Sequence, residues 1–299
     1  MSLSKSTKNQ LCRLLAFIPD KAYLHIAYFA HTKNRLHLSD PQTFNEKLQW
    51  LKINDKNPIY CKIVDKYTVR EYIKQKIGSE YLIPLLGVWD SANDIPFDQL
   101  PEKFVLKCTH DSGSVIVCTS KGDIDQKAVK QKLNKALKQN IFYNGREWPY
   151  KNVKPRIIAE EFLTEASGME PKDYKIFCFN GMPRFIQVDQ GRFHTHRRNM
   201  YTPEWQPMDM EIRVPRNRER EVDKPENLKE MLEFAKVLSK DFPFVRVDFY
   251  SVNNRLYFGE LTLYPGNGYG KITPDEWNHT LGEWIRLPDN KKQKANPTI

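Results

Sequence analysis

Two apolar segments late in the chain constrain the fold more than any other feature. The first reads VRVDFY at 245–250, the second reads LYFGELT at 256–262, and Asn253-Asn254 separate them. Asparagine tolerates the positive φ that a tight turn needs, so the pair favours a short connection. The pattern therefore predicts an antiparallel hairpin whose apolar strands each carry charged residues.

Carboxylates within apolar strands need positive charge beside them. Strand alternation puts Arg246 and Asp248 on one face. Asp248 lies five residues before Asn253 and Glu260 lies six residues after Asn254, so the hairpin brings the two carboxylates near one another. Carboxylate oxygens are hard ligands that suit Mg²⁺. Two interpretations stay open here: a magnesium site, or a separate Arg or Lys partner for each carboxylate.

The order of the other patterns indicates an α+β fold. Apolar residues recur at helical spacing within residues 1–60, and further helices are predicted at 65–77, 125–140 and 225–240. Strands are predicted at 81–88, 104–107, 115–119, 156–163, 174–179, 184–189 and 255–261, and the proline- and arginine-rich segment 202–224 is predicted to be an exposed loop. Strands and helices do not alternate as in a doubly wound sheet, and no GxGxxG or GxxxxGKS motif indicates a Rossmann or P-loop site.

One helix has a clear start signal in the sequence. Thr43 is a suitable N-cap residue, and Glu46 follows it by three positions, as in a capping box. The pattern predicts a helix from there through Leu51. It also assigns three apolar side chains of this segment to the core: Phe44, Trp50 and Leu51.

Composition limits the class of protein. A chain of 299 residues suffices for two domains, and 40% hydrophobic with 28% charged residues excludes a disordered chain or a simple coiled coil. No run approaches the roughly 18 apolar residues that span a bilayer, and no signal-peptide pattern is recognisable. The five cysteines show no CxxC spacing, which is typical of reduced thiols. We therefore expect a cytoplasmic protein.

The formal net charge is +10, from 47 Lys and Arg against 37 Asp and Glu. Such a charge suits nucleic acid, an anionic membrane surface, or acidic and phosphorylated substrates. The chain has no RNP-type strand, zinc framework or basic recognition helix, so we expect no specific nucleic-acid partner. The basic N-terminus and the Lys291–Lys294 tail suit peripheral contact with the anionic inner face of a membrane.

Two further segments have residues that suit nucleotide binding. Lys107 ends the apolar run FVLK and precedes the small-residue turn 109–114, so its ammonium and the backbone N–H groups of the turn can hold phosphate oxygens. The segment IIAEEFL at 157–163 offers backbone groups for an adenine edge and carboxylates for a ribose. Each segment alone is also compatible with an ordinary strand end at the surface.

Taken in order, these segments resemble the TupA-like (teichuronopeptide-biosynthesis-type) ATP-grasp proteins of surface-polysaccharide gene clusters. The resemblance extends over about residues 41–270. The motifs that carry it are PQTFNEKLQWLK (41–52), DKYTVREYI (65–73), YLIPLLGVW (81–89), FVLKCTHDSGS (104–114), IIAEEFL (157–163), DYKIFCFNG (173–181), VRVDFY (245–250) and FGELTLYPGNG (258–268).

The resemblance implies an ATP-grasp fold, in which two α+β lobes grip the nucleotide. We expect a helical N-terminal region at 1–60 and a first lobe at 61–156 with the loop that covers the phosphates. A second lobe at 157–288 would contain the metal site, and 289–299 would be a basic flexible tail. The sequence sets no oligomeric state.

The resemblance also assigns roles to matching residues. For ATP, the resemblance places Lys66 and Lys107 at the phosphates and Ser112, Gly113 and Ser114 in the loop that covers them. It places Glu160, Glu161, Phe162 and Leu163 at the adenine. Asp173 or Glu161 is expected at the ribose, and Lys175 is also expected to bind the nucleotide. Asp248 and Glu260 are expected to bind Mg²⁺, with Thr262 at the position where many relatives have asparagine, or with Asn267 in its place. The expected catalytic residues are Arg246, which would face an acyl phosphate, Lys107 and Lys175.

The implied activity is an ATP- and Mg²⁺-dependent ligase. It would join a carboxylate to an amine through an acyl phosphate, on a small-molecule or glycan precursor of a cell-surface polysaccharide, such as a lipid-linked precursor. A basic segment following strand 184–189 suits an anionic substrate: Arg192, His194, His196, Arg197 and Arg198. The alternative is a glycosyltransferase of surface-polysaccharide biosynthesis, which would prefer a sugar nucleotide to ATP.

Overall fold

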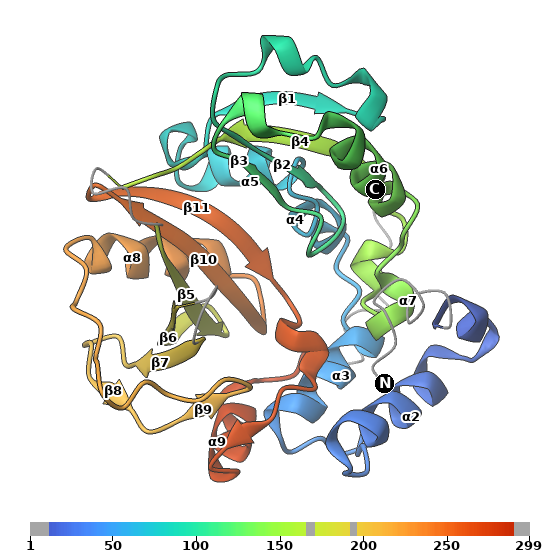
Figure 1. Cartoon of the computed structure of the whole chain (residues 1–299). Helices are drawn as coiled ribbons and strands as arrows, with labels where there is room; N and C mark the ends of the chain where they lie inside the picture. The colour runs from blue at the N-terminus through green and yellow to red at the C-terminus, as the bar shows by residue number, and fades with distance from the viewer. Residues whose placement is uncertain (1–11, 166–170, 192–195, 290–299) are drawn as a thin grey trace. The chain divides into compact units, whose positions relative to one another are not determined.

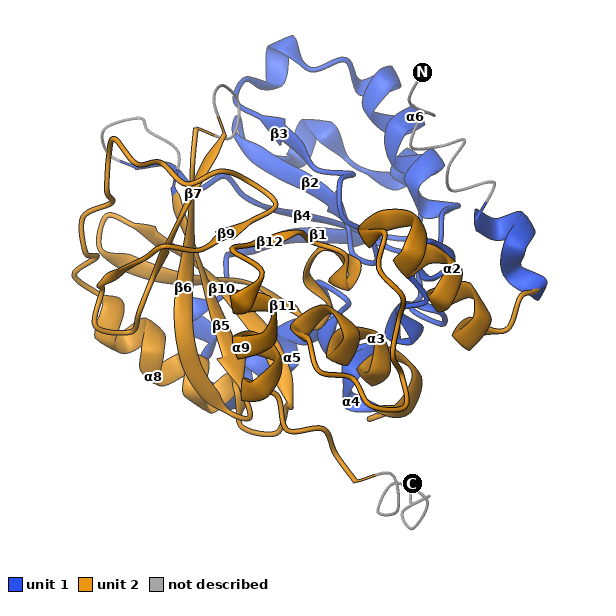
Figure 2. Cartoon of the chain, turned by 90° about the horizontal axis from the view of Figure 1, so that it is seen from below, with its two compact units in different colours: residues 1–17, 58–171 blue, residues 18–57, 172–299 orange. Residues whose placement is uncertain are grey.

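The computed structural model of the chain describes residues 12–165, 171–191 and 196–289. These residues form two compact units (Figures 1 and 2). Unit 1 consists of Met1–Phe17 and Pro58–Pro171, and unit 2 of Ile18–Asn57 and Lys172–Ile299. The early segment 18–57 thus groups with the C-terminal half of the chain. The expected domain boundaries stay predictions.

Unit 1 is built on a four-stranded antiparallel sheet in the order β1-β4-β2-β3. Its strands are β1 (Leu85–Trp89), β2 (Phe104–Cys108), β3 (Ile116–Cys118) and β4 (Ile157–Glu161), and its helices are α4 (Ile59–Ile63), α5 (Val69–Lys76), α6 (Gln126–Leu137) and α7 (Phe142–Gly145). Alternating apolar residues of β2 and β4 pack with Val129 and Leu133 of α6 in one core. The opposite face of β2 and β4 is left for Lys107 and Glu160.

Unit 2 is built on a six-stranded antiparallel sheet in the order β11-β10-β5-β6-β7-β8. Its strands are β5 (Lys172–Phe179), β6 (Met182–Gln190), β7 (Arg197–Tyr201), β8 (Pro207–Met208), β10 (Phe244–Val252) and β11 (Arg255–Thr262). The other elements are α2 (Asp20–Thr32), α3 (Phe44–Asn54), α8 (Leu228–Ser239), α9 (Glu276–Trp284) and the strand pair β9 (Glu211–Ile212) with β12 (Ile272–Thr273).

One face of the six-stranded sheet is apolar and the other is charged. Val245 and Val247 of β10 lie opposite Cys178 and Ile176 of β5 and are fully buried. The Cys178 thiol lies 3.8 Å from the carbonyl oxygen of Ala235, so this face packs against α8. Because side chains alternate along a strand, Arg246 and Asp248 of β10 are on the opposite face.

Helix α3 begins as the sequence predicts. The Thr43 hydroxyl accepts a hydrogen bond from the Glu46 N–H, and the Glu46 carboxylate accepts one from the Thr43 N–H, which completes a capping box. The same carboxylate also accepts hydrogen bonds from the N–H groups of Gln42 and His37. The expected core residues Phe44, Trp50 and Leu51 are all buried.

Replacing Glu46 with glutamine is expected to destabilise the protein by about 1–3 kcal/mol, because several buried donors lose a charged acceptor. Burial acts to raise the pKa of Glu46, but its hydrogen bonds lower it below the ordinary 4.5. The wild-type advantage should therefore be full above that value and decline as the pH falls below it. Urea unfolding across this pH range measures the difference. Glu276→Gln, an exposed acid in the first turn of α9, should change stability by less than about 0.5 kcal/mol at any pH.

Three predicted segments differ in the structure. The strand expected at 81–88 begins only at Leu85, because Ser79–Tyr81 form a 3₁₀ turn. The helix expected at 65–77 begins only at Val69, because the Asp65 side chain accepts hydrogen bonds from the N–H groups of Tyr67 and Thr68 and forms a turn there. The segment 202–224, expected to be an exposed loop, contains β8 and β9 with buried Met208, Met210 and Ile212. Met208, Met210 and Ile212 do alternate with charged residues, as in a strand with one buried face, but the prolines and arginines around this short run favoured a loop.

Within the described residues, no helix is both long enough and apolar enough to cross a bilayer. All five cysteines are free thiols, as their spacing indicates. Burial raises the pKa of Cys108 to about 11 and that of Cys178 to about 12, so both are unreactive in the folded protein.

Candidate active site

The β10–β11 hairpin brings Asp248 and Glu260 into direct opposition. Asn253 and Asn254 form its turn with φ values of 48° and 59°, as the sequence predicts. A plain register from this turn would place Asp248 opposite Gly259. A β-bulge instead leaves Gly259 unpaired and shifts the register by one residue. A Cβ atom on Gly259 would lie 3.0 Å from the carbonyl oxygen of Asp248, so a glycine suits this bulge.

Arg246 lies between the two carboxylates. Its Nε and Nη2 atoms donate to Asp248 at 2.7 and 2.6 Å, and Nη2 also donates to Glu260 Oε1 at 2.8 Å. Thr262 Oγ1 donates to the same Glu260 oxygen at 3.0 Å. Thr262 therefore orients Glu260, and whether it also binds a metal stays a prediction.

Burial and the neighbouring charges act in opposite directions on the pKa values of Asp248 and Arg246. Burial raises the pKa of Asp248 to about 6, although Arg246 and Lys175 act in the opposite direction. Burial acts to lower the pKa of Arg246, but the Asp248 and Glu260 carboxylates raise it above the ordinary value. Arg246 is thus a permanent cation, whereas the positive charge around Asp248 does not fully offset its burial.

The charged row continues across the sheet from Asp248 to Lys175 on β5. Lys175 is buried and contacts Asp173, with Asp189 and Asp248 at 3.5 and 3.8 Å from its Nζ. Asp189 at the end of β6 accepts from Arg198 Nε at 2.7 Å and pairs with His196 Nε2 at 3.0 Å. Burial acts to raise the pKa of Asp189, but Arg198 and Lys175 lower it well below its usual range.

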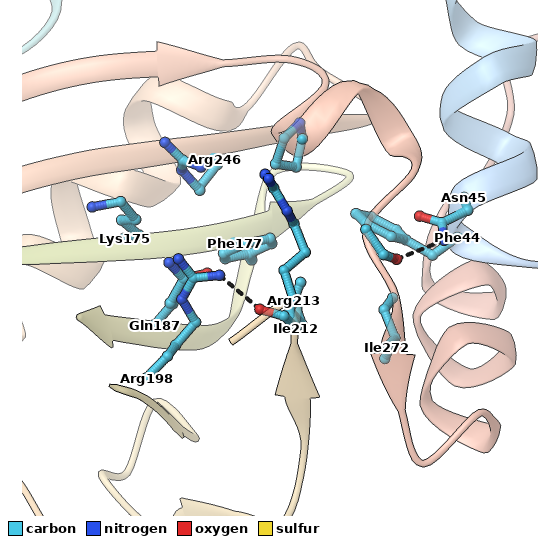
Figure 3. Close-up of a pocket in the computed structure, with 13 residues that line it drawn as sticks. Phe44, Asn45, Lys175, Phe177, Gln187, Arg198, Ile212, Arg213, Arg246 and Ile272 are labelled. Carbon is cyan, nitrogen blue, oxygen red and sulfur yellow. Dashed lines mark hydrogen bonds between the residues drawn. The ribbon is translucent and has the colours of Figure 1, made fainter. Parts of the chain in front are cut away.

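A pocket of about 80 Å³ opens on this charged face of unit 2 (Figure 3). On a scale where one water needs roughly 10–15 Å³, it holds a group of several non-hydrogen atoms. Four cationic side chains and no carboxylate are among its 13 lining residues: Lys175, Arg198, Arg213 and Arg246. Apolar side chains of Phe177, Ile212 and Ile272 form part of the wall. The pocket therefore suits a small anionic group attached to carbon.

Unit 1 contains a second charged cluster, centred on Glu160 of β4. This buried carboxylate lies 2.5 Å from Lys107 Nζ and 3.3 Å from Arg70 Nη1. Lys107 and Glu160 lie near one another because β2 and β4 are paired neighbours. Glu161 is exposed at the end of β4, and Phe162 and Leu163, which follow it, are half-buried. The nucleotide roles expected for these residues stay predictions.

The turn at 109–114 is held by its own side chains. Ser114 Oγ accepts from the Cys108 N–H at 2.8 Å and donates to Asp111 Oδ1 at 2.6 Å. Lys66 contacts this turn through both its N–H, which donates to the Thr109 carbonyl, and its ammonium, which contacts the Asp111 carbonyl. Ser112 and Gly113, by contrast, are exposed at the tip of the turn.

The other expected site residues lie apart from one another. Asn267 is in a short 3₁₀ segment, Pro265–Gly268, where its carbonyl accepts hydrogen bonds from Gln49 and Lys52 of α3 at 2.9 Å. Arg197 is half-buried at the start of β7. Arg192 and His194 lie outside the described residues. Among the described residues, no group of three or more His, Cys, Asp or Glu side chains is arranged as a metal site.

Sequence reasoning missed two residues of this face, Asp189 and Arg213. Asp189 was recognisable in principle, because it alternates with Phe185 and Gln187 along one predicted strand and ends next to a basic segment. Arg213 had a weaker signal, the short alternating run 208–214, which the prediction of a loop overlooked. It was one of several arginines in a predicted loop, and its position depends on residues more than 50 positions later in the chain.

Several solved structures, among them amino-acid ligases, are similar to this chain at low identity. D-alanine–D-alanine ligase from Bacillus anthracis is 15% identical, with a TM-score of 0.41, over 68% of this chain and 57% of that one. L-amino acid ligase from Bacillus licheniformis is 12% identical, with a TM-score of 0.46, over 84% of this chain and 57% of that one. D-alanine–D-alanine ligase from Helicobacter pylori is 14% identical, with a TM-score of 0.43, over 81% of this chain and 69% of that one. The chain thus spans little more than half the length of the two Bacillus ligases.

No curated protein matches the sequence. The model of the TupA-like ATP-grasp family matches residues 46–286, which is most of the chain and includes both charged clusters. The antiparallel sheets and mixed helices of the two units agree with the α+β fold that the sequence motifs indicate. The chain therefore belongs to the TupA-like ATP-grasp family.

Proposed function

We propose that this protein is an ATP- and Mg²⁺-dependent ligase that joins a carboxylate to an amine. One observation carries the proposal: Arg246 contacts the opposed carboxylates Asp248 and Glu260 and also lines the four-cation pocket. Arg246 therefore connects two carboxylates that can ligate a divalent cation with a pocket that suits an organic anion. An enzyme that activates a carboxylate with a metal nucleotide needs this combination.

Asp248 and Glu260 suit Mg²⁺ by their chemistry. Both offer hard carboxylate oxygens, and the β10–β11 register sets them opposite one another. These two residues would hold the metal, with Thr262 orienting Glu260 through its hydroxyl. When bound, Mg²⁺ supplies charge neutralisation for the phosphate oxygens of the nucleotide.

In the proposed reaction, a carboxylate oxygen of the substrate attacks the γ-phosphorus of ATP, and the bond to ADP breaks. The amine nitrogen then attacks the acyl carbon, inorganic phosphate leaves, and the amine loses a proton. Both steps concentrate negative charge, so positioned cations supply most of the stabilisation. Arg246 and Lys175 are held by buried carboxylates and are therefore preorganised for this task. Lys66 and Lys107 of unit 1 are proposed for the triphosphate.

The proposed substrate is an acidic precursor of a cell-surface polysaccharide, such as a uronic acid, joined to an amino compound. The pocket supports an acid by charge, and the family resemblance supports the polysaccharide context. A glycosyltransferase remains the alternative, and nucleotide choice separates the two.

The decisive test is the melting temperature of the protein with Mg²⁺ and ATP, GTP or a UDP-sugar. A ligand that binds only the folded state stabilises it by mass action and so raises the melting temperature. At a ligand concentration a hundred times the dissociation constant, the gain in stability is about 2.7 kcal/mol. Stabilisation by Mg-ATP is expected for the wild type and is expected to vanish in the variant Asp248→Asn with Glu260→Gln.

Glu204→Gln is the matched control, because Glu204 is an exposed carboxylate of the same unit, and it should retain the full response. Stabilisation by a UDP-sugar and not by ATP would contradict the ligase and favour the glycosyltransferase. If ATP stabilises, phosphate release should then be screened with uronic acids and amines in pairs.

A further inference from the structure

Arg213 differs from the other cations of the pocket in having no acidic partner. Lys175 contacts Asp173, Arg198 contacts Asp189, and Arg246 contacts Asp248. In the described part of the chain, no carboxylate lies within 4.0 Å of the Arg213 guanidinium, which makes no side-chain hydrogen bond there either. Burial lowers the pKa of Arg198, and the positive charges of Arg246 and Arg213 lower it further.

The backbone at Arg213 is strained and yet well held. Its φ of 62° lies in the left-handed region, which is uncommon for a residue other than glycine, asparagine or aspartate. The Arg213 N–H donates to the carbonyl of Lys271 at 2.9 Å, and the preceding residue Ile212 pairs with Ile272 in the β9–β12 ladder. Strained residues that the surrounding structure holds in place are concentrated at binding sites.

Two glycines make room for the Arg213 side chain. A Cβ atom on Gly270 would lie 3.0 Å from Arg213 Cγ and 3.1 Å from Cδ. A Cβ atom on Gly266 would lie 3.0 Å from Nη1 and 3.3 Å from Cδ. The side chain therefore passes along glycine backbone, and Figure 3 shows it extending from beside Ile212 into the pocket.

We propose that Arg213 binds a second anionic group of the substrate, so that the pocket selects a molecule with a carboxylate or phosphate besides the carboxylate that reacts. This inference rests on the proposed ligase function, which assigns the reacting carboxylate to Arg246. Arg213 is exposed, so its guanidinium is solvated and accessible, while the left-handed backbone and the glycine wall hold its side chain at the pocket, where an incoming carboxylate or phosphate can pair with it.

The other wall residues favour a dianion with a short carbon chain. Phe177, Ile212 and Ile272 offer apolar contact, and Gln187 offers an amide. Carboxylates of the protein already offset Lys175, Arg198 and Arg246, whereas the exposed guanidinium of Arg213 faces solvent and is available to pair with a second anionic group. A guanidinium can hold either a carboxylate or a phosphate through two parallel hydrogen bonds.

The test is calorimetric binding of three small anions without ATP or Mg²⁺, at constant ionic strength. Glutarate carries two carboxylates, 3-phosphoglycerate carries a carboxylate and a phosphate, and butyrate carries a single carboxylate. The wild type is expected to bind at least one dianion about tenfold or more tighter than butyrate, as a charge-assisted pair requires. The dianion preferred identifies the second group as carboxylate or phosphate.

Arg213→Gly is the informative variant because it removes the cation and relieves the positive φ. It should lose the preference for dianions while its urea midpoint stays equal to or above that of the wild type. A purely structural arginine would instead lower the midpoint. Arg213→Gln should show the same loss of preference, and Arg218→Gln, an exposed arginine of the same loop paired with Asp209, should retain it.

Equal binding of butyrate and both dianions by the wild type would overturn the inference, as would a preference that survives in Arg213→Gly. Neither result depends on nucleotide binding. Failure of the Mg-ATP response, by contrast, would contradict the proposed ligase while leaving the anion measurements interpretable.

Discussion

Replacing Arg246 with methionine is expected to destabilise the protein by about 3–5 kcal/mol, since removing one partner leaves a buried charge uncompensated. The Asp248 side chain is 5% exposed and directly faces Glu260, so without the guanidinium Asp248 must either stay charged beside Glu260 or take up a proton. The urea midpoint at neutral pH measures this loss. Turnover in the proposed ligase reaction should fall by a factor of about 10² or more.

The same variant should acquire a distinctive dependence on divalent cations. With Arg246 gone, Mg²⁺ becomes the cation that can separate the two carboxylates, so millimolar Mg²⁺ should restore part of the lost stability. The stability of Arg246→Lys should lie between those of the wild type and Arg246→Met, because lysine keeps the positive charge but cannot make the bidentate contact.

Arg255→Met is the matched control for this prediction. Arg255 lies on β11 of the same hairpin, but it is exposed and lies over the Tyr257 ring. Its loss should cost less than about 1 kcal/mol and should leave no response to Mg²⁺. A wild-type midpoint for Arg246→Met would show that the carboxylates do not depend on Arg246, and the site as described would be wrong.

The second large effect is expected for Asp189→Asn. This carboxylate is 2% exposed and lies against Lys175, His196 and Arg198, so its removal leaves buried cations without their counter-charge. The free energy of unfolding is expected to fall by about 3–5 kcal/mol. Arg198 and Lys175 would also move, and the pocket should bind anions differently.

The pH dependence of this effect follows from the lowered pKa of Asp189. A group whose pKa is lower in the folded than in the unfolded state contributes stability above its ordinary value, here 3.8. The difference between wild type and Asp189→Asn should therefore be constant between about pH 5 and about pH 8 and should shrink as the pH falls below 3.8. Urea unfolding of both proteins across this range measures it.

Asp209→Asn provides the comparison, because Asp209 also pairs with two arginines, Arg216 and Arg218, but at the surface. With a 70% exposed carboxylate, this change should cost less than about 1 kcal/mol. If the two variants were equally stable, burial would not govern the strength of the Asp189 cluster.

Several elements could be predicted because their causes are local. The capping box needs only Thr43 and Glu46, three residues apart, and the hairpin turn needs only two adjacent asparagines. Alternation along a strand likewise identified Arg246 and Asp248 as neighbours on one face. The resemblance of the ordered motifs then indicated the family, which the match over 46–286 confirms.

The facing of Asp248 and Glu260 was predicted by counting residues, but its cause is tertiary. The unequal count on the two sides of the turn requires an extra residue, and only the structure shows that Gly259 is that residue. The segment 202–224 was misjudged for a related reason. Its short strands are stabilised by partners far away, since β9 pairs with β12 about 60 residues later.

The sequence by itself determined the elements with local signals and the family, and it predicted that Asp248 and Glu260 lie near one another. Only the tertiary structure decided how the charges are distributed: that Asp189 offsets Lys175 and Arg198, that Glu160 offsets Lys107, and that Arg213 reaches the pocket with no acidic partner in the described chain. The physical reason is that electrostatic energy depends on distance and burial in space, and neither is encoded in the local spacing of residues.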